Sequence, residues 1–121
     1  MTATERIDFG KMDGLVPAIV QDAKTLEVLM VGFLNETSYA KTLETGFVTF
    51  WSRTRQKLWM KGETSGNRLR VIDAATDCDQ DTLLFRVEVE GDGLVCHEGT
   101  VICFTRPIAV EAAKSQEAVQ A

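Results

Sequence analysis

The sequence predicts a strand-rich α+β fold, formed by a single domain with a mixed, barrel-like sheet and one main helix. Its 121 residues match the length of one domain and are enough to bury about two-thirds of the surface of the unfolded chain. Several short segments have the alternating or continuous apolar pattern of strands. A single segment combines a good N-cap residue with a glycine that ends a helix.

Composition excludes several classes of protein. The hydrophobic fraction of 45% and the charged fraction of 26% are ordinary for a globular protein. A net charge of −5 argues against bulk nucleic-acid binding, and no apolar run approaches the roughly 20 residues of a membrane span. The first residues do not resemble a signal peptide, and three cysteines cannot all pair with one another. We therefore expect a cytoplasmic protein whose thiols are free to act as ligands.

The chain is expected to have three parts. These are a loose N-terminus over residues 1–6, a domain over 7–106 and a partly helical tail over 107–121. The domain begins with a strand over residues 15–22, in which Pro17 indicates either an edge strand or the first residues of a strand.

A second strand and the helix follow. The segment 28–34 is apolar throughout, which predicts a buried central strand. Asn35 is a favourable N-cap for a helix over residues 36–44, which Gly46 would end. Further strands are expected over residues 47–52, 58–60, 69–74 and 82–90, with a tight hairpin turn over 91–93.

The acidic segment from Asp77 to Asp81 is the most informative stretch of the chain. On a strand, alternate side chains point to opposite faces, so Asp77, Asp79 and Asp81 would line one face and Cys78 the other. Such carboxylates repel unless water screens them or a hard cation such as magnesium binds them. A solvated turn is the alternative. An EF-hand is excluded, because Thr82 replaces the required glycine and a strand pattern follows.

A second cluster contains the other two cysteines and the only histidine. Cys96 and Cys103 are seven residues apart around a glycine, which lets a loop bring both thiolates to one ion. Together with Cys78 they offer three protein ligands and leave one position open, as in a catalytic zinc site. Alternatively, these cysteines are small buried hydrophobic residues. His97 is either a catalytic group or an ordinary surface histidine.

Cations and aromatic residues gather between residues 51 and 62. Four of the chain's 13 Lys and Arg residues lie there: Arg53, Arg55, Lys57 and Lys61. With the loop 62–66, which includes Ser65, they suggest a phosphate-binding region, because guanidinium groups and backbone N–H groups both bind anions. The alternative is a solvated turn with Trp51 and Trp59 in the core.

These segments together resemble the phosphoribosyl-AMP cyclohydrolase family of histidine biosynthesis. Six motifs occur in the family's order: Gly-Leu-Val-Pro-Ala-Ile-Val-Gln-Asp at 14–22, Val-Leu-Met at 28–30, Trp-Ser-Arg-Thr-Arg at 51–55, Lys-Gly-Glu-Thr-Ser-Gly at 61–66, Asp-Cys-Asp-Gln-Asp at 77–81, and Cys-His through Cys-Phe at 96–104. One motif alone would be weak evidence, but six in order are highly specific. Many relatives have histidine at the positions of Met60 and Asn67, so a proton-transfer role there does not carry over.

The resemblance implies an intertwined homodimer with exchanged strands and two metals. Magnesium would bind Asp77, Asp79 and Asp81, and zinc would bind Cys78, Cys96 and Cys103, with Cys78 reaching the zinc of the partner subunit. The implied reaction is the opening of the adenine ring of 1-(5-phosphoribosyl)-AMP to the formimino-carboxamide ribotide. A zinc-activated water would attack C6 and the N1–C6 bond would break, which is similar to the attack made by the zinc deaminases.

The reaction implied by the resemblance also suggests roles for individual residues. His97 is the candidate for moving protons or orienting the water. The candidates for phosphate contacts are Arg53, Arg55, Lys57, Lys61 and Ser65. Two other classes remain: a zinc-stabilised module that binds a nucleotide or single-stranded nucleic acid without catalysis, and a protein with a structural zinc. The open zinc position and the separate acidic row favour the enzyme, because a structural zinc needs neither.

Overall fold

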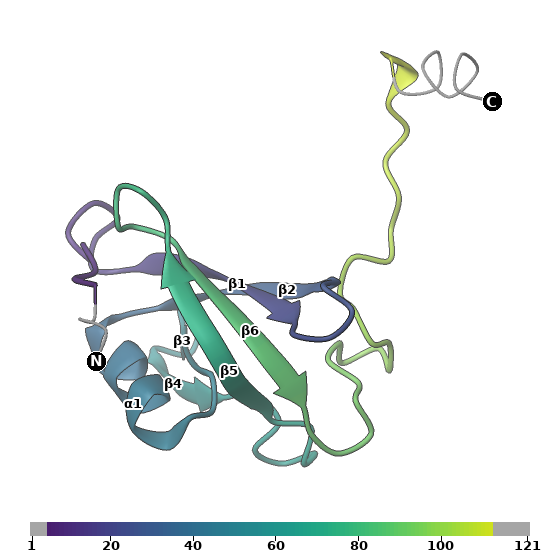
Figure 1. The fold of residues 1–121 in the computed structure, drawn as a ribbon, viewed down its shortest axis with the longest axis horizontal. Helices are drawn as coiled ribbons and strands as arrows, with labels where there is room; N and C mark the ends of the chain where they lie inside the picture. Colours follow the sequence, from purple (N-terminus) through teal and green to yellow (C-terminus); the bar gives the residue numbers. More distant parts are fainter. Residues whose placement is uncertain (1–4, 113–121) are drawn as a thin grey trace.

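The computed structural model describes residues 5–112 (Figure 1). In this part of the chain the elements are β1 Val16–Asp22, β2 Val28–Leu34, α1 Glu36–Thr45, β3 Thr49–Ser52, β4 Lys57–Met60, β5 Leu69–Thr76 and β6 Leu83–Val89. The strand-rich α+β prediction is confirmed. Parts of the predicted N-terminus and tail, residues 1–4 and 113–121, lie outside the described residues. The described helix is too short to cross a membrane.

Two open sheets make up the fold. The larger sheet has the order β2-β1-β6-β5, with β1 and β6 parallel and the other neighbours antiparallel. The smaller sheet is the antiparallel pair β3-β4. The prediction of a mixed sheet is confirmed, but the barrel-like closure is wrong for the described part of the chain, since β2 and β5 both end as edges.

The position of β2 corrects a second expectation. Its apolar run predicted a central strand, yet β2 lies at an edge of the sheet, and Val28 and Val31 are 42% and 46% exposed. A continuous apolar run shows that both faces of a strand carry apolar side chains. It does not show whether the strand has neighbours on both of its edges. The inner strands are β1 and β6 instead, and Pro17 is the second residue of β1, which fits the prediction that this proline marks the start of a strand.

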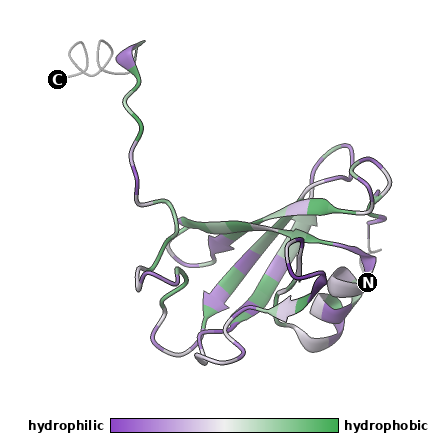
Figure 2. Ribbon diagram, turned by 180° about the vertical axis from the view of Figure 1, so that it is seen from behind, coloured by the Kyte–Doolittle hydropathy of each residue, from purple (hydrophilic) through white to green (hydrophobic). Residues whose placement is uncertain are grey.

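The core lies between the large sheet and the layer formed by α1 and the β3-β4 hairpin. Alternate residues of β1 and β6 point into it, and Figure 2 shows the resulting alternation of apolar and polar residues along the strands. Its largest buried side chains include Phe50, Phe85, Leu29, Leu34 and Leu69. Gly32 lets β3 approach β2, because a Cβ there would clash with the ring of Phe50.

Helix α1 has the predicted N-cap and C-terminal glycine, and a hydrogen bond connects it to the β3-β4 hairpin. Asn35 Oδ1 accepts a hydrogen bond from Ser38 N at 2.8 Å, and Ser38 Oγ accepts one from Asn35 N at 2.9 Å, which forms a capping box. Gly46 ends the helix with φ 81°. The buried Thr42 Oγ1 accepts a hydrogen bond from Thr49 N at 2.9 Å, so the helix fixes the start of β3.

The chain after β6 differs from the expected hairpin. Residues 91–93 turn, but no strand follows them in the described residues. The chain forms a compact loop over residues 94–105, and the segment beyond it runs away from the body of the molecule (Figure 1). The tight turn therefore serves to enter the cysteine loop and not to pair a further strand.

Candidate functional site

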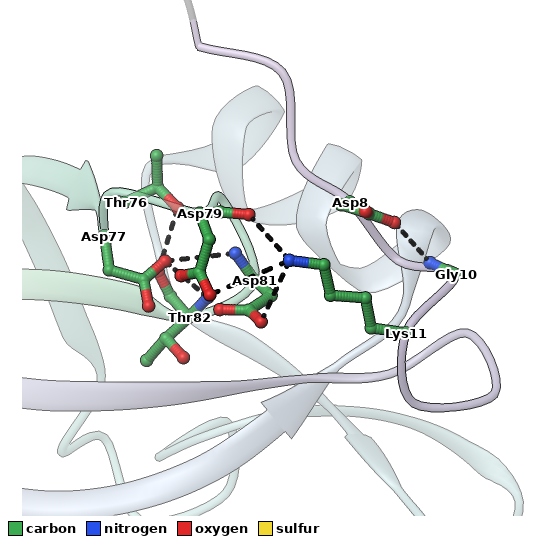
Figure 3. A network of polar contacts seen from close by, with 8 residues as sticks. All are labelled: Asp8, Gly10, Lys11, Thr76, Asp77, Asp79, Asp81 and Thr82. Carbon is green, nitrogen blue, oxygen red and sulfur yellow. Dashed lines mark hydrogen bonds and ion pairs between the residues drawn. The ribbon is translucent and has the colours of Figure 1, made fainter.

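The acidic segment forms a tight turn between β5 and β6 and not a strand (Figure 3). Asp77 Oδ1 accepts hydrogen bonds from Asp81 N at 3.0 Å and Thr82 N at 3.2 Å, which curls the chain around the Asp77 carboxylate. Gln80 has φ 63°, a left-handed conformation that an extended strand does not contain. The strand geometry expected from the sequence is therefore wrong, because a carboxylate followed by backbone donors favours a turn.

The three carboxylates nevertheless converge. Asp77, Asp79 and Asp81 each offer an oxygen, and these oxygens lie within 4.8 Å of one another. Hydrogen bonds with the Asp81 and Asp77 carboxyls raise the pKa of Asp79. Desolvation acts to raise the pKa of Asp77, but the N–H groups of Asp81 and Thr82 outweigh it and the pKa falls below its usual value. An all-oxygen donor set with crowded negative charge fits magnesium.

Lys11 lies on this cluster and was not expected from the sequence. Its ammonium is 3.4 Å from Asp81 Oδ2 and 3.7 Å from Asp79 Oδ2, and it donates to the Asp79 carbonyl oxygen at 3.1 Å. The parallel pairing of β1 with β6 brings the chain before β1 to the turn before β6. The sequence pattern near Lys11 does not predict this pairing, because the two segments are nearly 70 residues apart in the chain.

The second cluster is built by the loop that contains Cys96 and Cys103. Cys96 N donates to Thr100 O at 3.0 Å, and Cys103 N donates to Leu29 O of β2 at 2.8 Å. The Glu98 N–H, the Thr100 hydroxyl and the Cys103 thiol hydrogen-bond to Cys96 and lower its pKa. Burial, followed by the charge of Cys96, raises the pKa of Cys103. The two sulfurs are thus neighbours, and Cys96 is the thiol that ionises first.

Cys78 does not join this pair within one chain. It lies on the acidic turn before β6, whereas the loop of Cys96 follows β6 (Figure 1). The seven residues of β6 extend for about 20 Å at roughly 3.3 Å per residue. One chain therefore supplies two adjacent soft ligands, and the third predicted zinc ligand lies at the opposite end of the sheet.

A cavity of about 550 Å³ connects the cysteine loop with the cationic hairpin. Its volume is in the range of small-molecule sites. The predicted residues that line it are Arg55, Lys57, Lys61, Ser65, Cys96 and His97. Met60 and Asn67 line the same cavity, and His97, the one histidine of the chain, faces this space as well.

The loop from Gly62 to Asn67 forms one wall of the cavity. Gly66 N donates to Gly62 O at 2.8 Å, and Ser65 Oγ accepts a hydrogen bond from Asn67 N at 3.2 Å. Gly62 has φ 80°, and a Cβ on it would clash with the backbone of Asn67. Asn67 Oδ1 accepts a hydrogen bond from Asp92 N at 2.7 Å, which fastens this wall to the turn that precedes the cysteine loop.

Two residues differ from their expected places. Trp59, considered for the core, is 40% exposed on the cavity wall, with its ring 5.5 Å from the Phe50 ring and the Lys61 ammonium 5.2 Å from its centroid. Arg53 does not line this cavity, because its guanidinium lies 4.0 Å from the centroid of Phe33. A phosphate contact by Arg53 stays a prediction.

Comparison with known proteins decides the family. The family model described as phosphoribosyl-AMP cyclohydrolase matches residues 30–105, which include the acidic turn, all three cysteines and the cavity wall. The chain belongs to the phosphoribosyl-AMP cyclohydrolase family. This confirms the resemblance found in the sequence motifs and makes the chain a hydrolase of that family.

Individual relatives agree with this membership. A phosphoribosyl-AMP cyclohydrolase of Solibacter usitatus is 57% identical over 83% of this chain and 79% of its own length. One of Desulfatibacillum aliphaticivorans is 56% identical over 81% of this chain and 78% of its own. The histidine biosynthesis bifunctional protein HisIE of Vibrio parahaemolyticus is 55% identical over 84% of this chain, which spans only 47% of that protein.

Proposed function

We propose that the protein hydrolyses phosphoribosyl-AMP in histidine biosynthesis by opening its adenine ring between N1 and C6. Its family and the names of its relatives support the substrate. The observation that carries the proposal is the cavity, which joins cations suited to phosphates with His97 and a thiol of the predicted zinc site.

The substrate's parts match the walls of this cavity. Arg55, Lys57 and Lys61 supply positive charge for the ribosyl phosphates, and the loop around Ser65 offers hydroxyl and N–H donors. The exposed indole of Trp59 offers a surface on which a purine ring stacks. A purine there would take the place of the Lys61 ammonium, which would then be free to bind a phosphate.

Zinc would be held by Cys96 and Cys103 of one chain and Cys78 of the partner subunit. The distance of Cys78 from the other two cysteines along β6 supports a shared site in a homodimer. Exposed apolar residues on β2, at the end of the cysteine loop and in the segment beyond it provide surface for such a partner: Val28, Val31, Phe104, Ile108 and Val110. When bound, zinc would supply Lewis acidity that makes a nearby water easier to deprotonate.

His97 would move the proton in this reaction. Water adds its oxygen to C6 of the ring and the N1–C6 bond breaks. The water loses two protons as its oxygen becomes the carboxamide carbonyl: one goes to N1, and the other goes to the exocyclic nitrogen on C6, or to solvent when that nitrogen is already protonated. An imidazole that faces the cavity can accept a proton from the water and pass it to N1. Met60 and Asn67 line the same space but have no titratable group, so His97 is the imidazole available in this cavity.

The acidic turn would hold magnesium in the same assembly. Because Cys78 lies between Asp77 and Asp79 in the turn, a site that receives Cys78 from the partner also receives these carboxylates. When bound there, magnesium would supply positive charge to balance the negative charge of a substrate phosphate.

Ultraviolet absorbance during incubation with phosphoribosyl-AMP tests the proposal. Opening of the purine changes the absorbance of the base, and we expect the change to depend on enzyme concentration and to vanish in His97→Ala. Binding of the substrate without any change in absorbance would instead support the alternative, a nucleotide-binding module without catalysis.

A further inference from the structure

We propose that Lys11 is a tethered cation that occupies the acidic turn until a divalent metal displaces its ammonium, and that it thereby sets how tightly the turn holds the metal. The inference rests on the proposed function only in taking the turn as the magnesium site. It concerns a residue outside the stretch matched by the family model.

The ammonium of Lys11 uses the atoms that a hard cation would use. It contacts the carboxylates of Asp79 and Asp81 at 3.7 and 3.4 Å and the carbonyl oxygen of Asp79 at 3.1 Å (Figure 3). These are oxygen donors of the kinds that magnesium and calcium take. A metal on the same carboxylates would lie within a few ångströms of the ammonium, so the two cations compete.

The backbone places Lys11 at this position. Asp8 N donates to Gln80 O of the acidic turn at 2.7 Å, and Gly10 N donates to Asp8 Oδ1 at 2.9 Å. These bonds hold the chain that leads directly into Lys11. The side chain itself is 43% exposed, so the ammonium can move into solvent while the backbone contacts remain.

Removal of the lysine charge should strengthen metal binding. A unit charge and a divalent ion about 4–8 Å apart repel strongly enough, even at the dielectric constant of water, to change the dissociation constant by about fivefold to thirtyfold. We expect Lys11→Met to bind divalent metal about tenfold more tightly, and Lys11→Arg, which keeps the charge, to remain near the unsubstituted protein.

Calorimetric titration of the zinc-loaded protein with manganese, at fixed pH and salt, tests this. Manganese is the probe because it takes the same oxygen ligands as magnesium. Lys24→Met is the matched control, since Lys24 is an exposed lysine in the turn after β1 whose removal changes net charge equally. Asp79→Asn reports on the turn itself and should weaken binding, and Lys11→Gln repeats the test should Lys11→Met unfold.

The outcomes separate the two proposals. Tighter binding in Lys11→Met and Lys11→Gln, with Lys24→Met unchanged, supports the tethered cation. Equal or weaker binding in the two Lys11 variants, with Asp79→Asn weakened, overturns the role of Lys11 and leaves the magnesium site intact. Binding that Asp79→Asn does not alter removes the metal from the turn, and both proposals then fail there.

Discussion

At the scale of single residues, neighbouring groups of one type acquire different properties from their surroundings. Cys96 accepts hydrogen bonds from Glu98 N–H and Thr100, whereas neighbouring groups desolvate the Cys103 thiol, so the pKa values of the two thiols move in opposite directions. A thiolate at Cys96 is therefore available first as a ligand for a soft metal. A bound metal would then favour ionisation of Cys103, because its positive charge offsets the charge of Cys96.

Trp59 gives the first residue-scale prediction. Trp59→Leu should weaken binding of AMP, a purine mononucleotide without the second ribosyl phosphate, by about tenfold, since stacking of a base on an aromatic ring contributes about 1–3 kcal/mol. Calorimetry measures the affinity, and quenching of tryptophan fluorescence by AMP but not by ribose 5-phosphate reports the stacking.

Trp51 is the matched control for this prediction. It is the other tryptophan of the chain, it lies opposite Leu58 on the neighbouring strand, and it does not line the cavity. Trp51→Leu should keep the affinity for AMP and the quenching. Equal loss in both variants would mean that the effect comes from the stability of the hairpin and not from contact with the base.

Much of the candidate site could be predicted from residue types alone. Cations, a donor-rich loop, a histidine and a cysteine were each recognisable in local sequence, and Lys57, Lys61, Ser65, Cys96 and His97 indeed face one cavity. The place of Lys11 could not be predicted, because it depends on which strands pair. Arg53 could not be separated from Arg55 either, since only the packing of Phe33 draws Arg53 away.

At the scale of elements, local rules succeeded where the chain's own hydrogen bonds decide the structure. The helix follows its capping box and its glycine stop closely, with one added residue at its end. These local rules failed where the alternation of side chains on a strand was applied to Asp77 through Asp81. The Asp77 carboxylate accepts hydrogen bonds from backbone N–H groups that would otherwise pair with a neighbouring strand. The prediction that β2 is a central strand was wrong for a different reason: hydrophobicity alone does not determine the order of strands in a sheet.

Gly62 carries the prediction at this scale. Gly62→Ala should abolish most activity and lower the melting temperature, because the residue has φ 80° and an added Cβ would clash with the Asn67 backbone. The clash would push the loop out of the cavity wall. Activity on phosphoribosyl-AMP and thermal unfolding followed by circular dichroism measure the two effects.

Gly66 in the same loop separates the clash from the backbone conformation. It has φ 86°, but an added Cβ would meet nothing within 4 Å. Gly66→Ala should therefore cost only about 1 kcal/mol of stability, from the left-handed conformation, and keep most activity. Similar losses in the two variants would show that loop conformation matters and the close approach to Asn67 does not.

At the scale of the whole molecule, β6 separates the groups that the proposed chemistry needs together. The acidic turn with Cys78 precedes this strand, and the loop of Cys96 and Cys103 follows it (Figure 1). The apolar edge strand β2 lies beside that loop, since Cys103 bonds to Leu29, and its exposed valines leave a surface for another chain. Two copies related by a two-fold axis across such a surface would run antiparallel, and the opposite ends of their sheets would meet twice.

Mixed dimers test this arrangement. Cys78→Ser and Cys96→Ser chains should each be inactive, and each should lose zinc. After co-expression, or unfolding and refolding together, random pairing makes about half of the dimers mixed. In each mixed dimer one site collects both lesions and the other collects none, so activity and bound zinc should return to about a quarter of the unsubstituted level per total chain.

A second pairing of variants tells a shared site from simple mutual stabilisation. Cys96→Ser and Cys103→Ser place their lesions on the same side of every proposed site, so each site in a mixed dimer keeps one lesion and no activity should return. Recovery in this pair as well would show that the partner rescues folding and not ligation. If neither pair recovers although mass spectrometry shows mixed dimers, all three thiols act within one chain, and the sheet must rearrange to bring Cys78 around the length of β6.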